Sequence, residues 1–200
     1  MVINFAVLGD SIAYGLGASR EADTVTARLS ADLAAGGVPH RTRVLAVPGA
    51  RSSGLSTQVA TALTWPPHLA LIIIGANDLT RFVPPAEAAA QLESAVRALR
   101  AVNAEVVVAP APDLSVVPWV PAGMRATVRA ASTLMHDAQA GAALTAGAHV
   151  ADIGMSSAAG FARNRGLFSA DSFHPSSAGY AVIAEALTPA VRAVAGRLAR

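Results

Sequence analysis

Residue types that can perform nucleophilic catalysis lie near the two ends of the chain. Gly9-Asp10-Ser11 follows an apolar run, and a glycine there permits a tight turn from which a serine hydroxyl can point outward. Asp171 and His174 are three residues apart, so the carboxylate can hold one imidazole nitrogen while the other nitrogen faces a serine hydroxyl. Taken separately, Ser11 also fits a capping or loop serine, and Asp171 also fits a cap of the last helix beside an exposed His174.

Two further segments offer hydrogen-bond donors for an oxyanion. Gly75-Ala76-Asn77-Asp78 places a side-chain amide after an apolar run, and Pro48-Gly49-Ala50 places a backbone N–H in a loop. Both segments are also ordinary turn sequences. The Asn77 amide and the N–H groups of Ser11 and Gly49 can form an oxyanion hole only if the fold brings them together.

Five short β-rich runs alternate with helical patterns along the chain. Their near-continuous apolar character is typical of parallel strands that are covered on both faces. The expected strands are Ile3–Leu8, Arg43–Val47, Leu69–Ile74, Glu105–Ala109 and His149–Ile153. The alternation predicts a single domain over residues 1–200 with an α/β fold: a three-layer α/β/α sandwich around a flavodoxin-like, doubly wound, five-stranded parallel sheet.

Helical periodicity is clearest in the first and last helical segments. Val25, Leu29 and Leu33 share one face of a helix that should stop at Gly36-Gly37. The last helix has apolar residues at steps of three and four up to Leu198, and Pro189 is expected to kink or interrupt it. Residues 154–170, between the fifth strand and that helix, are interpreted as a loop.

The predicted sheet gathers the candidate residues at one edge, because every strand-to-helix loop of a parallel sheet emerges at the carboxyl ends of the strands. With the strand order 2-1-3-4-5, Ser11 lies at the switch point, and the loops that carry Gly49 and Asn77 lie on either side of it. The fifth strand is then about 14 Å from the first at ~4.8 Å per step. A segment as long as 154–170 can cover that distance at up to ~3.3 Å per residue.

These segments resemble the sequence blocks of the SGNH or GDSL hydrolases, and the resemblance covers essentially the whole chain. The blocks are Val7-Leu8-Gly9-Asp10-Ser11, the segment around Gly49, Gly75-Ala76-Asn77-Asp78, and Asp171-Ser172-Phe173-His174-Pro175 followed by Ser176-Ser177-Ala178-Gly179-Tyr180. Two departures stand out: Ile12 replaces the leucine of Gly-Asp-Ser-Leu, and Pro66-Pro67-His68 stands where family members often carry proline-aspartate. The second departure lies at the opposite edge of the sheet, so we expect it to affect stability rather than catalysis.

The resemblance implies a serine hydrolase that cleaves carboxylic esters with small or short-to-medium acyl groups and needs no cofactor or metal. Ser11 is the implied nucleophile, His174 the general base and Asp171 its orienting partner, with Ser11, Gly49 and Asn77 as oxyanion donors. Thioesterase, lysophospholipase, carbohydrate deacetylase and acyltransferase activities use the same machinery and stay open as alternatives. A non-catalytic flavodoxin-like protein that binds a ligand such as a flavin phosphate is the alternative from another class.

Contact with the substrate is expected at the same edge of the sheet. Candidate lining residues are Asp10, Val117, Trp119 and Phe173. The apolar, proline-containing segment 114–121 fits an acyl pocket or a lid, and equally a packed loop or an oligomer contact. Asp10 and Asp78 also fit residues that organise their loops by hydrogen bonding.

Composition argues against several other classes of protein. The 15 basic residues are all arginine and are scattered, and the net charge is only +2, which does not favour nucleic-acid binding. No apolar run reaches the ~18 residues that span a bilayer. The absence of cysteine removes thiolate sites and fits a reducing compartment, so we expect a cytoplasmic protein, with a secretion leader removed before residue 1 as the open alternative. The sequence leaves the oligomeric state open.

Overall fold

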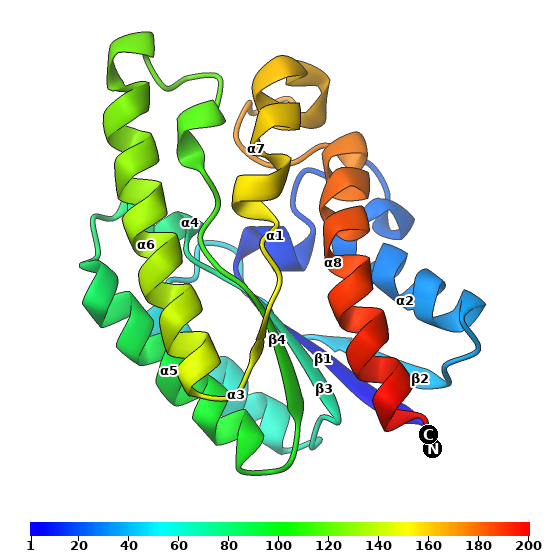
Figure 1. Cartoon of the computed structure of the whole chain (residues 1–200). Coiled ribbons are helices and arrows are strands. Elements are labelled where there is room, and N and C mark those ends of the chain that lie inside the picture. The colour runs from blue at the N-terminus through cyan, green and yellow to red at the C-terminus, as the bar shows by residue number, and fades with distance from the viewer.

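The computed structural model has a five-stranded parallel sheet between two layers of helices (Figure 1). It describes residues 1–200 except for the side chains at positions 155 and 156. The strand order is β2-β1-β3-β4-β5, as predicted. The strands are β1 (Ile3–Gly9), β2 (His40–Val44), β3 (Leu69–Ile73), β4 (Glu105–Ala109) and β5 (His149–Val150).

Eight α-helices are described around this sheet. They are α1 (Ser11–Tyr14), α2 (Val25–Ala35), α3 (Leu55–Leu63), α4 (Ala76–Thr80), α5 (Pro85–Arg100), α6 (Arg125–Thr145), α7 (Gly154–Arg163) and α8 (Ser177–Leu198). Helices α3, α5 and α6 lie on one side of the sheet and α2, α7 and α8 on the other (Figure 1). The two termini lie close together, at the end of the sheet opposite α1 (Figure 1).

The central strands are buried on both faces, and each face meets its own helices. Phe5 and Val7 of β1 share a core with Leu29 of α2, whereas Leu8 of β1 packs with Leu55 and the other apolar residues of α3 and α5. This two-sided burial explains why the strands appear in the sequence as continuous apolar runs rather than as alternating ones.

The two edge strands differ from their predicted bounds. β2 begins at His40 and ends at Val44, three residues earlier at each end than predicted, and its residues are exposed or half-buried. β5 is a two-residue strand where five were predicted, although the Ala151 N–H still donates to the Val108 carbonyl at 2.8 Å. An edge strand has a partner on one side only, so apolar content marks its ends less sharply than those of a central strand.

The predictions for the C-terminal region need two corrections. The segment predicted as a loop, 154–170, contains α7 and the short 3₁₀ helix Arg165–Leu167. Pro189 lies inside α8 and does not interrupt it. Leu187 and Val191 on either side of this proline are buried, so packing of the adjoining turns offsets the backbone hydrogen bond that a proline cannot make.

The departure at Pro66-Pro67-His68 lies at the amino end of β3. His68 Nδ1 accepts a hydrogen bond from the Asn4 backbone N–H at 2.9 Å, and the His68 N–H donates to the Asn4 carbonyl at 2.9 Å. The imidazole thus joins β1 to the start of β3 at the edge remote from Ser11.

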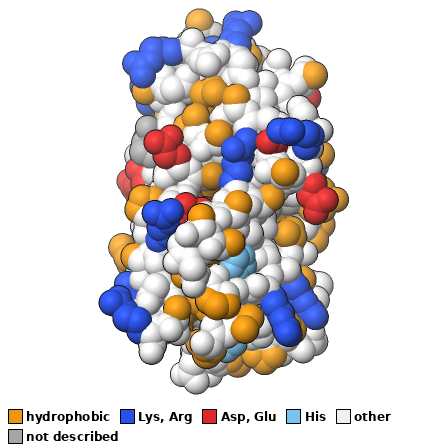
Figure 2. Space-filling model, turned by 90° about the vertical axis from the view of Figure 1, so that its right-hand side faces the viewer, with side chains coloured by type: hydrophobic (Ala, Val, Ile, Leu, Met, Phe, Trp, Pro, Cys, Tyr) orange, Lys and Arg blue, Asp and Glu red, His pale blue; other side chains and the backbone are white. Residues whose placement is uncertain are grey.

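Charged side chains are spread over the surface. On the face that carries α2 and α8, arginines are interspersed with acidic and apolar groups (Figure 2). One pair on this face joins the two helices, with Arg192 of α8 2.6 Å from both carboxylate oxygens of Asp32 of α2. Among the described residues, none of the helices combines the length and the apolar character needed to cross a bilayer.

Candidate active site

Ser11 is the first residue of α1, directly after the turn that ends β1. Gly9 has a φ of +131°, and a Cβ there would lie 1.9 Å from the Ile73 carbonyl oxygen, so the turn admits only glycine. Asp10 caps α1, with Oδ1 accepting from the Ile12 N–H at 2.9 Å. The local sequence therefore holds Ser11 at the carboxyl edge of the central strand.

His174 and Asp171 reach Ser11 from the segment before α8. His174 Nε2 lies 3.0 Å from Ser11 Oγ, and His174 Nδ1 lies 2.5 Å from Asp171 Oδ2. The structure thus brings together three predicted residues from opposite ends of the chain in the order carboxylate, imidazole, hydroxyl. This is the order of a Ser-His-Asp triad.

Local hydrogen bonds hold the Asp171 carboxylate in place. Its Oδ1 accepts from Ser169 Oγ at 2.7 Å and from the N–H groups of Phe173 and His174, each at 2.9 Å. Partial burial tends to raise the pKa of Asp171, but the hydrogen bonds from His174, Phe173 and Ser169 outweigh it and hold that pKa well below its ordinary value. Asp171 is therefore ionised and can stabilise a positive charge on the imidazole of His174.

The predicted oxyanion donors lie at the start of α1 (Ser11), in the loop after β2 (Gly49) and in α4 (Asn77), and hydrogen bonds join these segments. Asn77 Nδ2 donates to the Ala50 carbonyl at 3.0 Å, and the Val47 N–H donates to the Gly9 carbonyl at 3.1 Å, so the loop that carries Gly49 is tied on both sides. A side-chain amide has two N–H groups, which leaves Asn77 one more to donate. Within the described structure, the backbone N–H groups of Ser11 and Gly49 have no protein acceptor.

Two buried carboxyl groups support these loops. Asp78, directly after Asn77, accepts from the Ser52 N–H at 3.1 Å and from Ser52 Oγ at 2.9 Å, which fixes α4 against the loop after β2. Asp10 is 1 % exposed, and its burial, together with the nearby charge of Asp78, raises the pKa of its carboxyl to about 7. Asp10, predicted to contact the substrate, is buried and is not among the residues that line the cavity beside Ser11.

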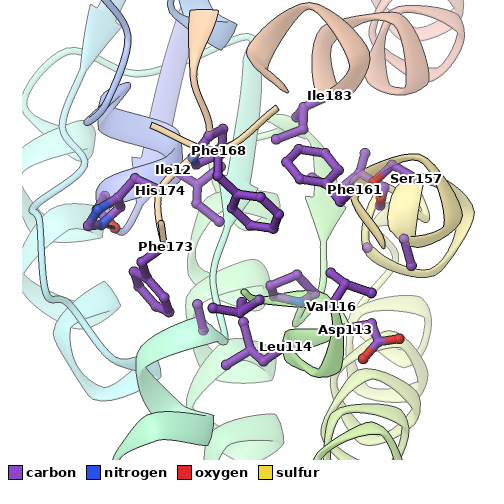
Figure 3. Close-up of a pocket in the computed structure, with 18 residues that line it drawn as sticks. Ile12, Asp113, Leu114, Val116, Ser157, Phe161, Phe168, Phe173, His174 and Ile183 are labelled. Atoms are coloured by element: carbon purple, nitrogen blue, oxygen red, sulfur yellow. Dashed lines mark hydrogen bonds between the residues drawn. The ribbon is translucent and has the colours of Figure 1, made fainter. Parts of the chain in front are cut away.

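A largely apolar cavity opens beside Ser11 and His174 and extends beneath α7 (Figure 3). Its volume is about 70 Å³. A single water needs ~10–15 Å³ of cavity volume, so the cavity has room for a small apolar group. Its apolar walls include Ile12, Val116, Phe161, Phe168 and Ile183.

The predicted lining residues fall in different places around this cavity. Val117 and Phe173 line it. Trp119 lies outside it, 55 % exposed, with its ring stacked on that of Phe173 at 5.7 Å. The segment 114–121 therefore contributes three lining residues, Leu114, Val116 and Val117, and the exposed Trp119 that stacks on Phe173.

Sequence reasoning missed the part of the cavity that α7 provides. Phe161 of α7 and Phe168 pack edge to face at 5.1 Å, and both project into the cavity (Figure 3). Ala158 and Phe161, three residues apart, carry the spacing of one helix face. That spacing was the available signal for a helix here.

The described residues hold no cluster of three or more His, Asp or Glu arranged to bind a metal. Two of the remaining histidines have partners of other kinds. His136 is buried with Nδ1 3.3 Å from the Ala111 carbonyl, and His149 Nε2 lies 3.0 Å from Glu105.

Comparison with known proteins assigns the chain to a family. Residues 7–182 match the sequence model of the GDSL-like lipase/acylhydrolase family. The chain belongs to this family. A GDSL-like esterase of Mycobacterium tuberculosis is 34 % identical over 194 residues, which are 95 % of this chain and 62 % of that protein. The chain thus spans less than two thirds of this family member.

Several solved structures share the fold of the present chain. TesA superposes with a TM-score of 0.80 at 22 % identity, over 96 % of this chain and 99 % of TesA. The psychrotrophic esterase EstA from a Pseudoalteromonas species gives 0.76 at 20 % identity, over 95 % and 97 % of the two chains. A variant of Axe2, an acetyl-xylooligosaccharide esterase from Geobacillus, gives 0.75 at 17 % identity, over 94 % of each chain.

Proposed function

We propose that this protein hydrolyses carboxylic esters of small molecules through an acyl intermediate on Ser11. The observation that carries the proposal is the 3.0 Å approach of His174 Nε2 to Ser11 Oγ while Asp171 holds Nδ1 at 2.5 Å. Hydrogen bonding of Nδ1–H to the carboxylate leaves the Nε2 lone pair facing the hydroxyl, so the imidazole can act as a base. Membership of the GDSL-like lipase/acylhydrolase family supports the same chemistry.

The proposed reaction has two steps of acyl transfer. His174 Nε2 accepts the Ser11 proton as Oγ attacks the ester carbonyl, and the resulting imidazolium then gives that proton to the departing alcohol. Water, deprotonated in turn by His174, attacks the acyl-Ser11 ester; the acyl C–Oγ bond breaks, the acyl group leaves as the carboxylic acid, and the imidazolium returns its proton to Ser11 Oγ. The ionised Asp171 stabilises the imidazolium in both steps.

The oxyanion of each tetrahedral intermediate is proposed to accept from the N–H groups of Ser11 and Gly49 and from the second N–H of Asn77. Such donors act in the transition state because they already point at the place where negative charge develops. The bond from Asn77 to the Ala50 carbonyl, which restrains the amide beside the loop that carries Gly49, supports this role.

Replacement of Asn77 by alanine is expected to lower kcat by about 10²–10³-fold with a smaller effect on KM, because one oxyanion donor is lost. Steady-state kinetics with a p-nitrophenyl ester measure this. Asn4→Ala is a matched control, since Asn4 Nδ2 makes the same kind of bond, to the Pro66 carbonyl at 3.1 Å, at the opposite edge of the sheet. Equal losses in the two variants would contradict an oxyanion role for Asn77.

We further propose that the acyl group occupies the apolar cavity and is small or short to medium in length. A volume of about 70 Å³ fits an acyl chain of a few carbons. The carboxylate of Asp113, which also lines the cavity, is paired: its Oδ1 accepts from the Ser115 N–H at 2.9 Å, and its Oδ2 lies 3.5 Å from Arg129 Nε. An apolar wall closed by Phe161 would favour short acyl chains over long ones.

Phe161→Ala is expected to shift the preferred acyl chain to greater length, because the ring closes part of the cavity. Each further methylene that becomes buried should raise kcat/KM by roughly fourfold, from ~0.8 kcal/mol per CH₂. A series of p-nitrophenyl esters from acetate to decanoate measures the optimum. Val191→Ala, which truncates a buried residue of the same core outside the cavity, should leave the optimum unchanged. An unchanged optimum in Phe161→Ala would show that the acyl chain binds elsewhere.

One experiment separates this proposal from the alternatives. Labelling of the wild-type protein by a fluorophosphonate, with the adduct mapped to Ser11 by mass spectrometry, is expected for a serine hydrolase and not for a non-catalytic flavodoxin-like protein. Parallel assays of oxygen esters, thioesters and acetylated sugars then rank the esterase, thioesterase and deacetylase activities. A cytoplasmic location stays a prediction from the composition.

A further inference from the structure

The ladder between β1 and β2 opens at the catalytic edge. Val7 pairs with Val44, and the Leu45 N–H donates to the Val7 carbonyl at 2.7 Å. One repeat further along, the Val47 N–H donates to the Gly9 carbonyl at 3.1 Å. Bonds in a parallel ladder are evenly spaced, so the Gly9 N–H should donate to the Leu45 carbonyl. It donates instead to the side chain of Gln58, at 2.7 Å from Oε1.

Gln58 satisfies both backbone groups of Gly9. Its Nε2 donates to the Gly9 carbonyl at 2.8 Å, so one side-chain amide bonds the N–H and the C=O of the same residue. Gln58 belongs to α3, 49 residues along the chain, and is 4 % exposed. The Gly9 carbonyl therefore accepts from Gln58 and from Val47 together.

This bridge lies where the two loops with backbone oxyanion donors leave the sheet. Gly9 precedes Ser11 by two residues, and Val47 precedes Gly49 by two residues. The distance between the Ser11 and Gly49 N–H groups therefore depends on the geometry at Gly9, where β1 and the segment after β2 diverge. The Gln58 amide occupies that point of divergence.

We propose that Gln58 is a positioning residue that sets the geometry of the oxyanion hole by holding Gly9; this inference rests on the proposed function. Only a side chain with one acceptor and one donor in a fixed arrangement satisfies both groups of Gly9. Leucine at position 58 would leave a buried N–H without an acceptor, and the Gly9 carbonyl would keep only its bond from Val47.

Glutamate at position 58 provides a conservative test, because the hydrogen bonds that its side chain can make to Gly9 depend on its protonation state. A neutral glutamic acid can accept from the Gly9 N–H and donate to the Gly9 carbonyl, as the amide does. The ionised form has no donor and repels the carbonyl oxygen. The activity of Gln58→Glu relative to wild type should therefore fall as the pH rises and the introduced carboxyl group ionises.

The experiment compares wild type, Gln58→Leu, Gln58→Glu and the control Val59→Ala. Val59 is the next residue of α3 and is buried in the core, but its apolar side chain cannot form the hydrogen bonds that Gln58 makes to Gly9. Rates are expressed per active site, counted by complete fluorophosphonate labelling of folded protein. Gln58→Leu should lose about 10–100-fold in kcat with little change in KM, the size expected when catalytic groups are displaced by about an ångström. Val59→Ala should lose thermal stability and keep the wild-type kcat per site.

A kcat per site in folded Gln58→Leu equal to that of wild type would overturn the proposal. If Gln58→Leu does not fold, a ratio of Gln58→Glu to wild-type activity that stays constant with pH overturns it instead. Failure of the proposed function gives a different result, because wild type itself would then neither take the fluorophosphonate label nor turn over any ester.

Discussion

Replacement of Ser11 by alanine is expected to lower kcat for a p-nitrophenyl ester by on the order of 10⁵-fold or more, the size seen when the nucleophile of a triad is removed. Ser11 Oγ lies 3.0 Å from His174 Nε2, and alanine leaves no side-chain oxygen there that can form the acyl intermediate. The residual activity expected in this variant comes from the oxyanion donors and the cavity, which orient the ester for attack by water.

The variant should remain folded, since the lost hydroxyl makes its side-chain hydrogen bond to His174 and supports no other described element. Circular dichroism and a thermal melt check this alongside the kinetics. Ser56→Ala is a suitable control, because Ser56 is exposed on α3 and its hydroxyl bonds the Ser53 carbonyl. Full activity in Ser11→Ala would end the proposal of an acyl-Ser11 intermediate.

The second large effect is expected for Asp171→Asn, at about 10³–10⁴-fold in kcat. Three donors point at Oδ1 of Asp171, so the amide oxygen of asparagine should take that place. The amide nitrogen then replaces Oδ2 and donates to His174 Nδ1. This places the imidazole proton on Nε2, which faces Ser11 as a donor and can no longer accept the hydroxyl proton.

Kinetics at several pH values test this tautomer argument. Because the pKa of Asp171 is held well below its ordinary value, that carboxylate stays ionised, and wild-type kcat/KM should rise with pH in a step as the triad becomes able to accept the Ser11 proton. Asp171→Asn should stay slow on the alkaline side of that step, since deprotonation gives the wrong tautomer. Asp32→Asn removes a carboxylate that pairs with Arg192 outside the cavity and should behave as wild type. A loss of less than tenfold in Asp171→Asn would contradict the assigned role.

Much of the fold follows from the order of apolar runs along the chain. The central strands β1, β3 and β4 were predicted to within one residue because they are covered on both faces and need apolar residues at nearly every position. The edge strands differ from their predicted bounds: β2 begins and ends earlier than predicted, and β5 is shorter. An edge strand is less completely covered, so it needs fewer apolar residues, and its ends are harder to recognise in the sequence. Local signals also predicted the end of α2 before Gly36-Gly37.

The sequence by itself determined the succession of strands and helices and the chemical types that follow the strands, including Ser11, Asn77, Asp171 and His174. It could do so because turn glycines, apolar runs and short spacings depend on neighbours in the chain. Only the tertiary structure decided that Asp10 is buried and that α7, with Phe161, contributes to the lining of the cavity. The same holds for the bond from Gln58 to Gly9, which joins residues 49 positions apart. Such contacts depend on how helices pack on the sheet, and packing of distant residues leaves no periodic pattern in the sequence.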